Sequence, residues 1–135
     1  MEKQLIKDKY NQDEIKNQDD SLVVWYNELL NKNESQLTKL DINRMIRQNV
    51  LIDLALNQAI LELIKNPFDG ELTNGDILEH VLMLDEKVLQ TKASDFNKII
   101  KKAEQDINSF PWWYPEEKDE YLELLKKLKK TINSK

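Results

Sequence analysis

The chain has 135 residues, a formal net charge of −5, a single His and no Cys. At this length one domain is expected, and the lack of Cys excludes disulfides, thiolate metal sites and a Cys nucleophile. The longest apolar run, Leu22 to Tyr26, is too short to span a bilayer, and no apolar secretory signal follows the first residues. We therefore expect a cytoplasmic protein without a membrane partner.

The residue usage favours helices over strands. Val and Thr are sparse, Leu, Ile, Lys, Glu and Asp dominate, and only two Gly and three Pro interrupt the chain. Strands would need alternating β-branched residues and frequent turn signals, which are missing. We predict an all-α fold, a single compact helical bundle-like domain over residues 1–135, with about five to seven helices. Residues 1–18 form either a short amphipathic helix or a frayed end.

The first half of the chain contains the strongest helix signals. Asp20-Ser21 offers an N-cap for a helix over residues 22–31, and residues 38–41 (Thr-Lys-Leu-Asp) match an acidic capping box. Residues 50–65 are apolar around most of a helix circumference, because their polar residues fall on one narrow stripe. Such a helix is central and packed on several sides. The Pro of Asn66-Pro67 ends it.

The second half begins with a loop over residues 68–76, which holds both glycines. Thr73 or Asn74 is expected to cap the helix that follows, with Asp76 in its first turn. Asp85 or Ser94 starts further turns, and apolar residues repeat at helical spacing over 96–107. A rigid aromatic connector over residues 110–115 then leads to a last helix, with Pro115 at its first position.

The acidic charge is concentrated towards the N-terminus. Residues 1–90 carry 10 basic and 17 acidic groups, whereas residues 91–135 carry 10 basic and 8 acidic groups. An acidic body repels phosphate backbones, so direct nucleic-acid binding is disfavoured, and it favours a basic partner. Solubility alone is the simpler explanation of the same charge.

The sequence offers little to an enzyme. His80 is the only His, no second His stands near it, and no Gly-rich phosphate loop is present. Asp69 and Glu71 are paired carboxylates, but their spacing does not show that they converge on a substrate. We expect no catalytic residue, no metal site and no cofactor.

Two segments are candidate protein interfaces. The acidic residues Asp69, Glu71, Asp76 and Glu79 either dock a basic partner or belong to a solvated loop with helix-capping acids. The aromatic residues Trp112, Trp113 and Tyr114 either anchor an interface or form a small core that clamps the last helix, which is the simpler reading.

One stretch of the chain resembles a known family. It contains residues 41–48 (Asp-Ile-Asn-Arg-Met-Ile-Arg-Gln), an apolar helix, residues 66–72 (Asn-Pro-Phe-Asp-Gly-Glu-Leu) and residues 75–78 (Gly-Asp-Ile-Leu). In this order and spacing, residues 38–85 resemble immunity proteins of bacterial contact-dependent growth inhibition systems. The resemblance implies a small cytoplasmic protein that binds the C-terminal domain of a cognate toxin, often a nuclease with a basic cleft, and neutralises it. The alternative is a helical regulatory or scaffold module without a toxin partner.

The residues shared with the family also have structural explanations. Arg47 and Gln48 stand where two helices meet. Arg47 is expected to be a buried or half-buried anchor that binds carbonyls at a helix end, and Gln48 to satisfy the same junction. The alternative for both residues is contact with the toxin. Pro67 ends the central helix. Gly70 and Gly75 are expected to supply either a positive φ or a close approach of the backbone.

Overall fold

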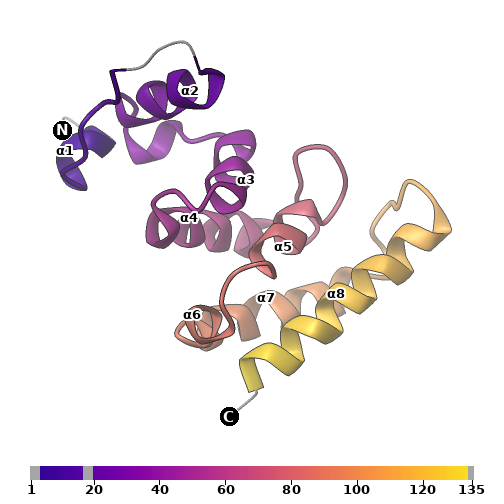
Figure 1. Cartoon of the computed structure of the whole chain (residues 1–135). Coiled ribbons are helices and arrows are strands. Elements are labelled where there is room, and N and C mark those ends of the chain that lie inside the picture. The colour runs from indigo at the N-terminus through magenta and orange to yellow at the C-terminus, as the bar shows by residue number, and fades with distance from the viewer. Residues whose placement is uncertain (1–3, 17–19, 134–135) are drawn as a thin grey trace. The chain divides into compact units, whose positions relative to one another are not determined.

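The computed structural model in Figure 1 describes residues 4–16 and 20–133. The chain divides into two compact units, Met1–Asp41 and Ile42–Lys135. The described residues form eight α-helices, more than the five to seven predicted, and one short 3-10 helix. They contain no strand, so the predicted all-α class is confirmed. The single domain over residues 1–135 stays a prediction. The elements in chain order are α1 (Ile6–Lys9), α2 (Ser21–Leu30), η1 (Glu34–Gln36), α3 (Lys39–Arg47), α4 (Ile52–Lys65), α5 (Asp76–Val81), α6 (Glu86–Gln90), α7 (Ala93–Asp106) and α8 (Pro115–Asn133).

The first unit contains α1 and α2, which contact each other. Its helix α2 begins where the sequence predicts, because the Asp20 side chain accepts a hydrogen bond of 2.8 Å from the Leu22 N–H. The short helix α1 lies inside the segment predicted to be a short helix or a frayed end. Residues 1–3, 17 and 18 of that segment lie outside the described residues.

The predicted capping box at residues 38–41 is confirmed. The Thr38 N–H donates to Asp41 Oδ2 at 3.0 Å, and the Asp41 N–H donates to Thr38 Oγ1 at 3.1 Å. Asp41 also accepts hydrogen bonds from Trp25 Nε1 at 3.0 Å and Lys32 Nζ at 2.8 Å. Burial raises the pKa of Asp41, but the bonds from Lys32, Thr38 and Trp25 outweigh it and lower the pKa below its usual value.

The second unit is built around α4, as predicted. Helix α4 packs against α5 and α7, and α8 packs against α6 and α7. The buried side of α4 is apolar throughout, which supplies the core. Its members are Leu54, Ala55, Leu56, Ala59, Ile60 and Leu63. The helix is less enclosed than its composition indicates, because Leu61 and Ile64 are exposed.

The junction of α3 and α4 corrects an expectation about Arg47 and Gln48. Both side chains are exposed, so neither is the buried anchor that we expected. The backbone closes the helix end instead: the Val50 N–H donates to the Met45 carbonyl at 2.9 Å, and the Asn49 N–H donates to the Ile46 carbonyl at 3.2 Å. This is a Schellman motif with Asn49 in the left-handed position, φ 56°. Because the backbone satisfies its own carbonyls, no side-chain donor is needed.

Helix α4 also begins later than predicted, because the residue before it has a left-handed conformation. Leu51 precedes the helix with φ 45° and ψ 56°, so α4 begins at Ile52 rather than near residue 50. Its end agrees with the prediction, since Asn66 is extended before Pro67.

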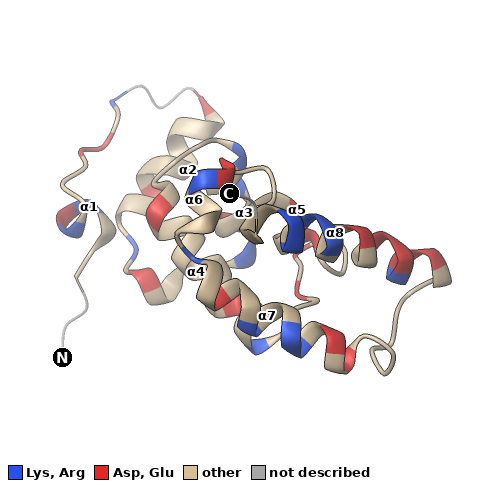
Figure 2. Ribbon diagram, turned by 90° about the horizontal axis from the view of Figure 1, so that it is seen from below, with Lys and Arg blue, Asp and Glu red and all other residues tan. Residues whose placement is uncertain are grey.

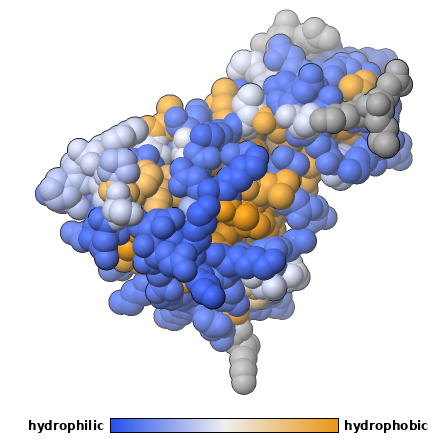
Figure 3. Space-filling view, turned by 180° about the vertical axis from the view of Figure 1, so that it is seen from behind, coloured by the Kyte–Doolittle hydropathy of each residue, from blue (hydrophilic) through white to orange (hydrophobic). Residues whose placement is uncertain are grey.

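The surface matches the composition of the sequence, of which 33% is charged residues. On the face that Figure 3 shows, hydrophilic residues cover most of the surface and apolar residues are exposed in smaller areas between them. None of the described helices combines the length and the apolar composition that crossing a membrane requires.

Candidate functional site

The loop between α4 and α5 is folded around one carboxylate. Asp76 Oδ1 accepts hydrogen bonds from the Glu71 N–H at 2.8 Å and from Asn43 Nδ2 at 3.1 Å. Its Oδ2 accepts from the N–H groups of Leu72, at 2.8 Å, and Thr73, at 3.1 Å. Burial raises the pKa of Asp76, but these hydrogen bonds to the ionised form lower it overall. Asp76 is therefore a buried anion that fixes the loop.

Both glycines of the loop are needed by the backbone, as predicted. A Cβ atom at Gly70 would collide with the Thr73 carbonyl oxygen. Gly75 has φ 80°, and a Cβ atom there would lie 2.8 Å from Cδ2 of the Tyr121 ring. The first glycine permits a close approach and the second permits both a left-handed turn and contact with α8.

The predicted cap of α5 is wrong. The N-cap residue is Gly75, and no side chain caps the helix. Thr73 contributes its backbone carbonyl, which accepts from the Asp76 N–H at 3.3 Å, and the Asn74 side chain bonds Glu117 instead. The left-handed conformation of Gly75 turns the chain directly into the helix, which removes Thr73 and Asn74 from the capping position.

A cluster of aromatic rings packs against Phe68 of the loop. Phe68 is in ring contact with Phe110, Trp112 and Tyr121, with centroid distances of 4.5, 5.1 and 4.9 Å. Tyr121 Oη donates to the Pro67 carbonyl at 2.9 Å, and burial raises the pKa of this phenol. The loop and the start of α8 therefore share one small core.

The aromatic connector divides into inward and outward residues. The Trp112 ring lies in the cluster, and its Nε1 donates to the Ile107 carbonyl at 2.9 Å. Trp113 is 65% exposed and Tyr114 is 43% exposed. Clamping of the last helix explains Trp112, but it does not explain the two aromatic residues that follow.

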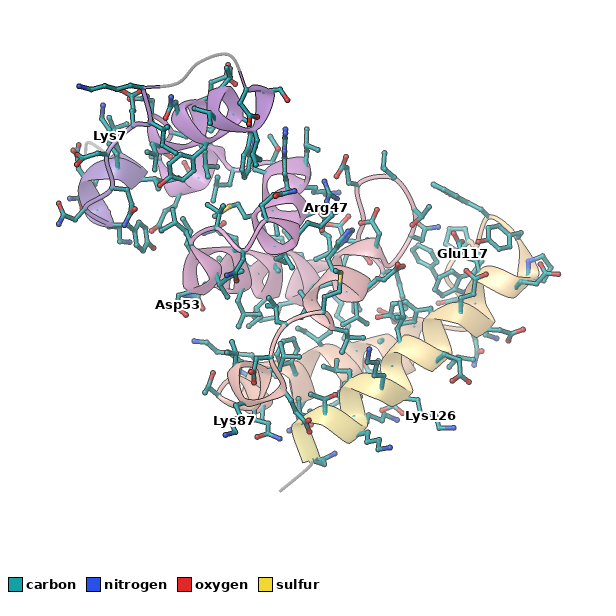
Figure 4. All side chains as sticks on the ribbon, viewed as in Figure 1. Lys7, Arg47, Asp53, Lys87, Glu117 and Lys126 are labelled. Carbon is teal, nitrogen blue, oxygen red and sulfur yellow. The ribbon has the colours of Figure 1, made fainter. Side chains whose placement is uncertain are left out.

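Glu117 joins the loop to the connector. This residue of the first turn of α8 is 3% exposed. Its Oε1 accepts from Asn74 Nδ2 at 3.0 Å and from the Trp113 N–H at 2.9 Å. Figure 4 labels Glu117 near the start of α8. Sequence reasoning missed this role, because a Glu after Pro115 is typical of a solvated first turn.

Asn43 is the second polar residue that sequence reasoning missed. It is fully buried beside Ile42 and Met45, and its Nδ2 reaches Asp76 from α3. This buried hydrogen bond fixes the position of the loop relative to α3. The sequence contained one signal of this role, since Asn43 is a polar residue between the apolar residues Ile42 and Met45.

The four acidic residues predicted to dock a partner have different environments. Glu79 is exposed, and Asp69 and Glu71 are half-exposed. Asp69 Oδ1 accepts from the Gly70 N–H at 3.0 Å. Asp76 is buried within the loop, so its side chain is not available to a partner. It contributes to a docking surface by holding the loop backbone, which carries Asp69 and Glu71.

His80 lies on the same helix as Glu79. Its Nδ1 is 2.7 Å from the Asp76 carbonyl oxygen, so this nitrogen carries the proton. In the neutral ring Nε2 then accepts from Arg47 Nη1, 3.4 Å away. Within the described residues, no three His, Asp or Glu side chains are grouped so that they would hold a metal ion.

Comparison with protein families gives one match. A family model described as CDI immunity proteins matches residues 7–99, more than half of the chain. This confirms the resemblance seen in residues 38–85, and it extends from α1 into α7. A search of curated proteins gives no match, and a search of solved structures gives none either. The connector and α8 follow the matched segment.

Proposed function

Because the chain belongs to the CDI immunity protein family, whose function is to neutralise toxins, we propose that its toxin is a nuclease. We further propose that it binds the C-terminal domain of this toxin in the cytoplasm. Proteins of this family act by binding a cognate toxin and are generally not enzymes. The proposal therefore concerns which toxin chemistry this chain recognises.

The observation that carries the proposal is the charge of the chain. Residues 1–90 carry 17 acidic and 10 basic groups. A nuclease needs Lys and Arg in its substrate cleft to hold phosphates, and an acidic surface complements such a cleft while it repels the nucleic acid itself. We propose Asp69, Glu71 and Glu79 as docking carboxylates, since all three have exposed surface. Asp76 belongs to the same site as the residue that holds the loop.

The test first identifies a toxin gene beside the gene for this chain and then uses the purified toxin domain, with plasmid DNA and RNA as substrates. We expect the toxin to cleave one of them and the chain to abolish cleavage at an equimolar ratio. A toxin domain that binds the chain but cleaves neither nucleic acid would contradict the nuclease proposal. A toxin domain that the chain neither binds nor inhibits would contradict the assignment of that toxin as its partner.

The docking carboxylates are tested by a triple variant, Asp69→Asn, Glu71→Gln and Glu79→Gln. Removing exposed charges mainly lowers the association rate, and the loss is largest at low salt, where screening is weakest. Asp53→Asn is the matched control, because Asp53 is an exposed carboxylate in the first turn of α4. Association rates that are equal in the triple variant and the control would remove these residues from the interface.

A further inference from the structure

The acidic loop and the aromatic connector are neighbours in the second unit. Glu117 Oε1 accepts hydrogen bonds from the Asn74 side chain and from the Trp113 backbone, at 3.0 and 2.9 Å. Two donors that share one oxygen atom lie within a few ångström of each other. The two segments that the sequence offers as alternative interfaces therefore border one another, and they form one surface.

This surface exposes large apolar side chains. Leu72 of the loop is 73% exposed, and Trp113 of the connector is 65% exposed. Tyr114 is also exposed, and its Oη donates to Glu120 Oε2 at 3.2 Å. Trp and Tyr are enriched among the residues that carry most of the binding energy of protein interfaces. The backbones of Leu72 and Trp113 are both fixed by buried carboxylates.

The same surface is strongly acidic. Residues 67–80 and 112–120 together contain eight carboxylates and one Lys, and all of these carboxylates except the buried Asp76 and Glu117 have exposed surface. The Lys residue, Lys118, donates a hydrogen bond from its Nζ to Asn108 Oδ1 at 2.7 Å. Figure 2 shows the acidic residues at the start of α8 and the basic residues towards its end. An apolar centre with acidic surroundings fits a basic protein partner.

The carboxylates that a partner can reach are the exposed ones. Glu117 is buried, and its Oε2 has no hydrogen-bond partner among the described residues, so it holds the connector and does not touch a partner. Glu116 and Glu120 of the same helix are exposed. Exposed carboxylates next to an exposed indole ring suit a Lys or Arg side chain.

We propose that this composite surface, formed by the loop and by the connector with the start of α8, binds an Arg or Lys side chain of the cognate toxin. The cation lies against the face of Trp113, near the exposed carboxylates at the start of α8, while Leu72 and Tyr114 pack around its aliphatic stem. A cation over an indole ring is attracted by the ring and by nearby carboxylates together. The inference rests on the proposed function only in taking the toxin as the partner.

The test measures the affinity of the unchanged chain and its variants for the same purified toxin domain, at low and high salt. We expect Leu72→Ala and Trp113→Ala each to weaken binding roughly tenfold or more, as truncated anchors do. Glu116→Gln removes an exposed carboxylate in the first turn of α8, so it weakens binding and makes the salt dependence shallower. Thermal unfolding checks that each variant is folded.

Matched controls lie elsewhere on the second unit. Leu61→Ala removes an apolar side chain that is 53% exposed on α4, and Asp53→Asn removes an exposed charge; neither is expected to alter binding. If the unchanged chain binds the toxin and the Leu72 and Trp113 variants bind equally well, the composite surface is wrong and the proposed function stands. If the unchanged chain does not bind the toxin, both fail. Self-association of the chain that Trp113→Ala abolishes would identify a second copy as the occupant and overturn the inference.

Discussion

Asp76 Oδ1 accepts a hydrogen bond of 3.1 Å from Nδ2 of Asn43, which lies 33 positions earlier on α3. The same carboxylate accepts three backbone N–H groups of the loop that precedes it. Glu117 holds the far side of this loop through Asn74. Two buried acidic residues therefore fix the loop between α3 and α8, and its exposed residues are presented on a rigid backbone.

We predict that Asp76→Asn destabilises the fold. The substitution replaces one carboxylate oxygen by an NH₂ group, so loop N–H donors lose their acceptor. The expected loss is about 2 kcal/mol or more, because leaving buried donors unpaired costs on the order of 1–3 kcal/mol. Urea unfolding at pH 7 measures it. Glu79→Gln on the same helix is exposed and serves as the control, so equal losses for the two variants would contradict the prediction.

The lowered pKa of Asp76 predicts a pH dependence. An unfolded Asp has a pKa of about 3.9, and the folded value lies below it. The carboxylate therefore stabilises the fold fully above this pH, and its contribution is lost as the pH falls through the folded pKa. We expect Asp76→Asn to show a smaller loss of stability than the unchanged chain between pH 7 and pH 3, measured from urea midpoints at both pH values. Parallel losses in the two proteins would mean that Asp76 does not contribute.

The conformation of Gly75 gives a third prediction. An Ala at this position must adopt a φ of 80° and place its Cβ 2.8 Å from the Tyr121 ring. We expect Gly75→Ala to cost about 1–3 kcal/mol, the range for strained backbone positions. Gly75→Asn separates the two causes, because Asn tolerates the left-handed region but still has a Cβ. An Ala variant within about 0.5 kcal/mol of the unchanged chain would show that the loop adapts easily.

Local signals made much of the fold predictable from the sequence. Asp20, Thr38 and Pro115 are found at helix starts because caps and N-terminal Pro act through neighbouring backbone groups. The apolar repeat of α4 predicts a central helix because burial follows periodicity. Gly70 and Gly75 are also explained locally, although only the structure shows that Tyr121 is what Gly75 approaches.

The roles that the sequence could not predict depend on contacts between distant residues. Asp76 looks like an acidic residue in the first turn of a helix, and its burial follows from the loop folding back over it. Glu117 has the same appearance, and its partner Asn74 is 43 residues away. Arg47 is exposed because the backbone around Asn49 satisfies the helix end without it. In each case the local sequence is compatible with both a buried and an exposed side chain, and contacts with distant residues decide which one occurs.

The fourth prediction concerns the core of the second unit. Leu56 on α4 is 2% exposed, whereas Leu61 on the same helix is 53% exposed. We expect Leu56→Ala to cost roughly 2–5 kcal/mol, the range for truncating a packed Leu, because it leaves a cavity. Leu61→Ala is expected to stay within about 0.5 kcal/mol of the unchanged chain. Chemical denaturation of both variants tests the difference, and similar losses would mean that α4 is not buried on the side described.

The fifth prediction separates the two oxygens of Glu117. Glu117→Ala removes the acceptor of Asn74 Nδ2 and of the Trp113 N–H, and we expect it to cost about 1–3 kcal/mol, because two part-buried donors lose their partner and a buried side chain is truncated. Glu117→Gln retains Oε1, and the Oε2 that it replaces has no hydrogen bond to lose. Gln is therefore expected to stay within about 1 kcal/mol of the unchanged chain. Amide hydrogen exchange gives the decisive measurement: protection at Trp113 should be lost with Ala and kept with Gln, and equal protection in both variants would show that Glu117 does not hold the connector.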